Sequence, residues 1–160
     1  SPEEAEHVRL RPNHIIRMEF LDFVVGETKL ESKETLVTSA DSVKTGTAKI
    51  DGKSVDVYGK VTAKLKESRK QVRSRGILAM EIYDYQQKKI LLRKELPGEF
   101  NWANEWASFN GDERALTKEQ LALTKNREEL PPPPQQLFIE FCKPIYSQFT
   151  SEVKRFYDKY

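Results

Sequence analysis

The chain has little of what several classes of protein depend on. Its one cysteine, Cys142, excludes an internal disulfide and any zinc site built on cysteines. Its seven glycines are scattered singly, so no glycine-rich loop is present to hold a phosphate. No apolar run reaches the length of about 18 residues that a transmembrane helix needs. An excess of one charge is also lacking, because 27 basic residues stand against 25 acidic ones, which argues against a general nucleic-acid binder.

The 160 residues are enough for one domain with a modest core. Residues 1–13 are polar, rich in glutamate and interrupted by Pro2 and Pro12, which predicts a linker or a disordered tail. The chain begins with Ser1 instead of methionine, so we expect a processed protein or a piece of a longer one. We expect residues 14–160 to form a single α+β domain.

Residues 15–97 carry the pattern of a β-sheet. Residues 15–25 are rich in β-branched and aromatic residues, and Gly26 is expected to end this strand. In residues 55–65 apolar and polar side chains alternate, as in a strand with one buried and one wet face. Further strands are expected around residues 34–38, 47–50, 76–83 and 89–96.

The links between these strands are short. Asp51-Gly52 suits a hairpin turn, residues 66–75 form a polar link, and Pro97-Gly98 is expected to end the sheet. Because parallel strands need long crossovers, we expect an antiparallel meander of five or six strands. A short barrel is the variant topology.

Two helices are expected after the sheet. Thr117 and Gln120 have the spacing of a capping box, which predicts a short helix over 117–125. The proline segment 131–134 then imposes an extended backbone. Apolar residues recur every three or four positions in 135–159, so an amphipathic helix is predicted to cover one face of the sheet. Pro144 is expected to kink or split this helix.

The segment 98–114 holds both tryptophans among amides and acids, and it shows no clear helix or strand period. We therefore expect a loop, whose indoles could stack on sugar rings or anchor a partner protein. The other interpretation is that they fill the end of the core beneath the last helix, and we expect at least one indole to be buried against the sheet or that helix. The candidate binding residues are Asn101, Trp102, Asn104, Glu105, Trp106, Asn110 and Asp112.

Catalysis has weaker support. Glu99, Glu105, Asp112 and Glu113 could hold calcium or supply the carboxylate pair of a glycoside hydrolase, but neither spacing is diagnostic. Neither His7 nor His14 belongs to a nucleophile or zinc motif, and Cys142 lies on the apolar stripe of the last helix. We predict no catalytic residue, no metal site and no cofactor.

Residues 60–75 are locally basic. A solvated strand face is the expected reading, and binding to an anionic surface or to nucleic acid is the alternative. Few aromatic residues are interleaved there, so nucleic acid is not an expected partner. The cations are Lys60, Lys64, Lys66, Arg69, Lys70, Arg73 and Arg75.

Two segments, 97–117 with both tryptophans and 131–138 with its four prolines, resemble the carboxy-terminal part of uncharacterised cell-envelope proteins of Bacteroidetes-type bacteria, often predicted lipoproteins. The resemblance implies an extracytoplasmic location, in the periplasm or at the outer membrane. It also implies a domain cut from a longer chain. No activity, cofactor or catalytic residue comes with it.

The leading hypothesis is a non-enzymatic binding or scaffolding domain of a larger bacterial cell-envelope protein, with a protein or an envelope glycan as partner. One alternative is a glycan-acting enzyme that uses the acids near the tryptophans. The other is an anionic-surface or nucleic-acid binder that uses residues 60–75. The sequence leaves the oligomeric state open.

Overall fold

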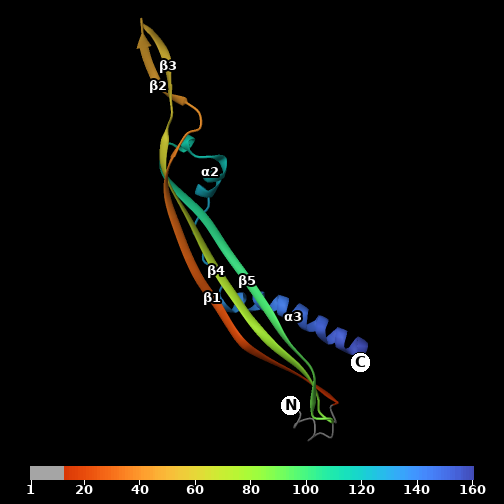
Figure 1. Cartoon of the computed structure of the whole chain (residues 1–160). Coiled ribbons are helices and arrows are strands. Elements are labelled where there is room, and N and C mark those ends of the chain that lie inside the picture. The colour runs from red at the N-terminus through yellow and green to blue at the C-terminus, as the bar shows by residue number, and fades with distance from the viewer. Residues whose placement is uncertain (1–12) are drawn as a thin grey trace. The chain divides into compact units, whose positions relative to one another are not determined.

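The computed structural model describes residues 13–160, and the predicted tail therefore falls almost wholly outside the described residues. Strands β1, β4 and β5 form one sheet in the order β1-β4-β5, and β2 and β3 form a separate hairpin (Figure 1). The sheets are mostly antiparallel, the larger one is open and not closed into a barrel, and a long helix ends the chain, which confirms the α+β class. The elements are β1 (His14–Thr38), β2 (Val43–Ile50), β3 (Lys53–Gly59), β4 (Thr62–Asp84), β5 (Lys89–Gly111), η1 (Glu113–Ala115), α2 (Lys118–Thr124) and α3 (Pro134–Lys159).

Contacts divide the described chain into two compact units, each assembled from separate segments. Unit 1 consists of the described residues up to Glu27 with 72–101 and 132–160. Unit 2 consists of residues 28–71 and 102–131. A single domain over 14–160 stays a prediction.

Helix α3 covers one face of the sheet in unit 1, as the sequence predicts. Phe141 and Ile145 of α3 are buried against β4, whose Leu78, Met80 and Ile82 point into the same core. Leu96 of β5 completes the buried cluster. Pro144 does not split α3, which is one helix from Pro134 to Lys159.

Two glycines bring α3 close to the sheet. A Cβ atom on Gly76 of β4 would lie 2.8 Å from Cε2 of Phe141. A Cβ atom on Gly98 of β5 would overlap the backbone oxygen of Phe141 and lie 2.6 Å from Cγ1 of Ile145. Such distances are far below van der Waals contact, so only residues without a Cβ fit beneath this part of the helix.

Three of the predicted strands differ from those in the structure. β1 continues through Gly26, which has a φ of +79°, and β5 continues through Pro97 and Gly98 to Gly111. β1 and β5 are the edge strands, where a bulge or a missing N–H is tolerated because one side of the strand has no ladder to complete. The predicted strand 55–65 is divided instead, since β3 ends at Gly59 and β4 begins at Thr62.

The polar link expected at 66–75 is also wrong, because these residues form the middle of β4. Two of the buried positions in this part of β4 are serines. Because serine is polar, the alternation of buried and exposed residues cannot be recognised from hydropathy. The Ser74 hydroxyl accepts a hydrogen bond from the Gly26 amide at 3.1 Å, and the Ser68 hydroxyl lies 3.0 Å from that of Ser32. Both serines therefore link β4 to β1.

The local turn and capping signals are confirmed. Asp51 and Gly52 have positive φ values of 52° and 77°, as a two-residue hairpin turn between β2 and β3 requires. Thr117 and Gln120 form the reciprocal hydrogen bonds of a capping box at the start of α2.

Among residues 13–160, no helix combines the length and apolar character needed to cross a membrane.

Candidate functional site

The expected tryptophan loop is a strand, because residues 98–111 belong to β5. Phe100, Trp102 and Trp106 are half-buried, and the exposed Asn101 and Glu105 lie between them. Phe100, Trp102 and Trp106 all stand at even-numbered positions, which was the available signal of a strand, although Asn104 interrupts the aromatic series. Neither indole belongs to the core cluster beneath α3.

Six of the seven candidate binding residues lie in unit 2, whereas Asn101 lies in unit 1. Asn104 holds the segment that follows α2: its Nδ2 donates to the Arg127 carbonyl at 3.2 Å, and its Oδ1 accepts from the Glu129 amide at 2.9 Å. Asn126 Nδ2 donates in turn to the Glu105 carbonyl at 3.1 Å. These amides are therefore engaged in fixing residues 126–129 along β5.

A hollow of about 690 Å³ in unit 2 has the Trp106 indole on its wall. Nε of Arg69 lies 3.5 Å from Oε1 of Glu105 at this hollow. Nζ of Lys70 lies 5.9 Å from the indole centroid and 2.6 Å from Oε1 of Glu128. The hollow thus combines an aromatic ring with charged and hydroxyl groups. Its walls are formed by Leu30, Glu31, Ser32, Lys33, Glu67, Ser68, Arg69, Glu105, Trp106 and Leu123.

Three of the four candidate catalytic acids are paired with arginines: Glu99 with Arg73, Glu105 with Arg69, and Asp112 with Arg114. Hydrogen bonds from Arg114 lower the pKa of Asp112 from 3.8 to about 2. In unit 1, hydrogen bonds from Arg73 and then Asn101 lower the pKa of Glu99, and the charge of Arg75 acts in the same direction. A general acid needs a raised pKa, so these two carboxyls are unsuited to donating protons near neutral pH.

Asp112 has a structural position. Its Oδ1 accepts a hydrogen bond from the Arg114 amide at 3.0 Å, which caps η1. Nη2 of Arg114 lies 2.7 Å from Oδ2 of Asp112, and Nη1 donates to the Lys44 carbonyl of β2 at 2.7 Å. The pair therefore connects η1 to the β2–β3 hairpin.

Among residues 13–160, no group of three His, Cys, Asp or Glu side chains is placed to hold a metal ion.

The cations of residues 60–75 do not all belong to one unit. Arg73 and Arg75 lie in unit 1, and the other five lie in unit 2. Arg69 and Lys70 are paired with Glu105 and Glu128, and Nε of Arg73 lies 2.6 Å from Oε1 of Glu99. Pairing with carboxylates reduces the positive charge that these side chains could offer to phosphates.

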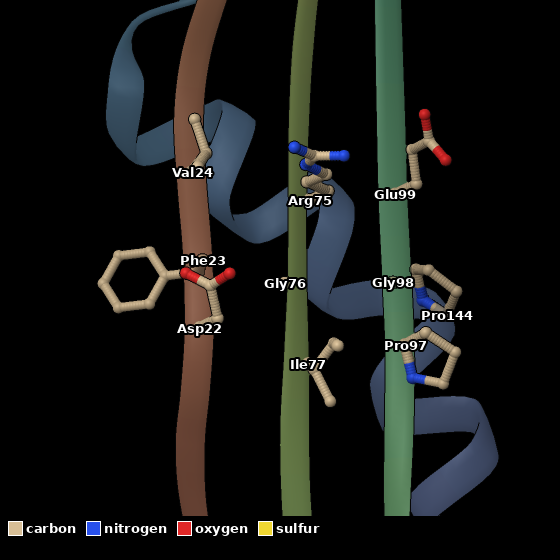
Figure 2. Close-up of a pocket in the computed structure, with 10 residues that line it drawn as sticks. All are labelled: Asp22, Phe23, Val24, Arg75, Gly76, Ile77, Pro97, Gly98, Glu99 and Pro144. Atoms are coloured by element: carbon tan, nitrogen blue, oxygen red, sulfur yellow. The ribbon is translucent and has the colours of Figure 1, made fainter.

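A second hollow, of about 620 Å³, lies in unit 1 and was not expected from the sequence (Figure 2). Figure 2 shows α3 passing behind the three strands at this place. Arg75 is the only cation among the residues that line this hollow, and its charge helps to lower the pKa of Glu99, which lines the hollow too. The alternation of Arg73, Arg75 and Ile77 was the available signal that these side chains share a face of β4. The hollow is lined by Asp22, Phe23, Val24, Arg75, Gly76, Ile77, Pro97, Gly98, Glu99 and Pro144.

Comparison of the chain with known protein families, with curated proteins and with solved structures finds no match.

Proposed function

We propose that the chain is a non-enzymatic binding or scaffolding domain of a larger bacterial cell-envelope protein. The observation that carries the proposal is the hollow of unit 2, where the Trp106 indole stands beside the Arg69–Glu105 ion pair. An indole provides a stacking face, and the charged and hydroxyl groups around it provide directed hydrogen bonds. This combination suits a sugar ring, so an envelope glycan is the ligand to test first.

Binding is favoured over glycan hydrolysis by the state of the acids. Glycoside hydrolysis needs one protonated carboxyl and one ionised carboxylate on either side of the scissile bond. Asp112 and Glu99 both have lowered pKa values and accept hydrogen bonds from arginine, and they lie in different units. Glu105, the candidate acid at the hollow, is paired with Arg69.

The proposed location in the cell envelope, as part of a lipoprotein, is supported by the resemblance of residues 97–117 and 131–138 to envelope proteins. Anionic-surface binding has less support, because three of the seven cations in residues 60–75 are paired with carboxylates.

The proposal is tested by NMR, because the chain has two tryptophans and hence two indole N–H signals. Muropeptides from digested peptidoglycan and chitotetraose are titrated into the ¹⁵N-labelled chain. We expect the Trp106 signal to shift, Trp106→Ala to abolish binding, and Trp102→Ala, the matched control, to retain it. Mass spectrometry of the same mixtures should find every glycan intact.

Two outcomes would contradict the proposal. Newly released glycan fragments would show an enzyme. Binding that persists in Trp106→Ala would show that the hollow of unit 2 is not the site.

A further inference from the structure

We propose that two copies of the chain associate through the free edge of β1 in unit 1. β1 is the outer strand of the order β1-β4-β5, so within residues 13–160 it pairs with a strand on one side only. The other side offers a row of backbone N–H and C=O groups to a further strand. This association does not involve the hollow of unit 2, so it can hold whether or not the proposed function is correct.

The same edge exposes large apolar side chains. Met18 is 57% exposed and Phe23 is 52% exposed. Figure 2 shows the Phe23 ring extending beyond β1 on the side away from β4. Such a run of apolar side chains along an open strand edge marks a surface for association.

The apolar surface continues from β1 onto α3. The Phe138 ring centroid lies 5.5 Å from that of Phe20 and 6.0 Å from that of Phe23. Next to Phe138 on α3, Ile139, Cys142 and Tyr146 line a shallow, mainly apolar hollow. A strand added beside β1 would therefore place its helix-side residues against side chains that the monomer leaves partly in water.

The strand that fits best is β1 of a second copy. Phe20 packs on α3, so strand alternation assigns Ile16 and Met18 to the same face. A two-fold axis perpendicular to the sheet makes the two β1 strands antiparallel and keeps both α3 helices on one side. The added strand then brings its own apolar residues to the helix face of the first copy.

Charge also favours a second copy. When the register is centred on Met18, Arg17 of each copy faces Glu19 of the other, and the symmetry makes two such pairs. Arg17 lies on the face away from α3, where its Nη1 is 3.9 Å from Oε1 of Glu81. Opposite charges that face each other across strands stabilise the pairing, whereas like charges oppose it.

The oligomeric state tests the proposal. We expect light scattering to give twice the chain mass of 18.6 kDa at micromolar concentration. Met18→Lys should give the monomer. Ile50→Lys is the matched control, because Ile50 is also 57% exposed but lies on β2 in unit 2, and this variant should stay dimeric. Circular dichroism verifies that each variant is folded.

Charge variants test the register. Glu19→Arg places two arginines opposite each other, which should raise the dimer Kd at least about tenfold. Adding Arg17→Glu to Glu19→Arg restores opposite charges and should recover dimerisation. A chain that stays monomeric at all concentrations would overturn the proposal. The strand that pairs with the free edge of β1 would then have to come from another protein. Equal loss of the dimer in Met18→Lys and Ile50→Lys would also overturn it.

Discussion

At the scale of single residues, Gly76 and Gly98 determine how closely α3 approaches the sheet. Both lie under Phe141, one on the central strand β4 and one on the edge strand β5. Neither glycine has a positive φ. Glycine is required at these positions because a side chain would not fit beneath the helix. A methyl group at either position would push the helix away from the strands and loosen the contacts of the whole buried cluster.

We therefore expect Gly98→Ala to destabilise the protein by about 1 to 3 kcal/mol, the usual cost of overpacking a core. Gly46→Ala on β2 is the matched control, because a Cβ there meets nothing within 4 Å. Urea unfolding of both variants measures the difference. Similar midpoints for Gly98→Ala and the wild type would show that α3 has room to move.

Asp112 should make stability depend on pH in acid. Its pKa is lowered from 3.8 to about 2 in the folded state. The ionised carboxylate therefore stabilises the fold fully at pH values above 3.8, the pKa in the unfolded chain. This contribution is lost as the pH falls through about 2. The Tm difference between wild type and Asp112→Asn should be largest above pH 4 and shrink toward pH 2. A difference that stays constant over this interval would assign the effect to packing.

At the scale of elements, the helices were predictable and the lengths of the strands were not. A capping box and an apolar spacing of three and four are local signals, and they define α2 and α3 within a residue or two. A strand ends where its neighbour stops pairing, which is not a local property. Gly26 and Pro97 read as terminators, but both lie on edge strands that tolerate them.

The candidate site was predictable to a similar extent. The residue types of the tryptophan segment predicted a binding surface, which stays a prediction, and Trp106 and Glu105 from that set line the hollow of unit 2. The ion pairs Arg69–Glu105 and Arg73–Glu99 join β4 to β5 and depend on the register between them. The sequence predicted neither these pairs nor the hollow of unit 1.

Helix α3 is held by a few large contacts, of which Phe141 is the largest. Its side chain is fully buried, and Phe141→Ala should destabilise the protein by about 3 to 5 kcal/mol. Tyr58→Ala on β3 is the control, because Tyr58 is 62% exposed and its truncation should cost less than about 0.5 kcal/mol. Urea unfolding compares the two variants. Equal losses would mean that α3 contributes little to the core.

At the scale of the whole molecule, the segments of the two units alternate along the chain. Unit 1 contains β1 residues up to Glu27, residues 72–101 and, last of all, α3, whereas the final segment of unit 2 ends at Pro131. Ribosomes deliver a chain from its amino terminus, so the sheet of unit 1 emerges before the helix that covers it. All residues of unit 2, in contrast, are synthesised before α3. Until α3 has been synthesised, Leu78, Met80 and Ile82 remain open to aggregation, and a nascent chain stalled before residue 134 should bind chaperones that a chain extended through α3 no longer needs.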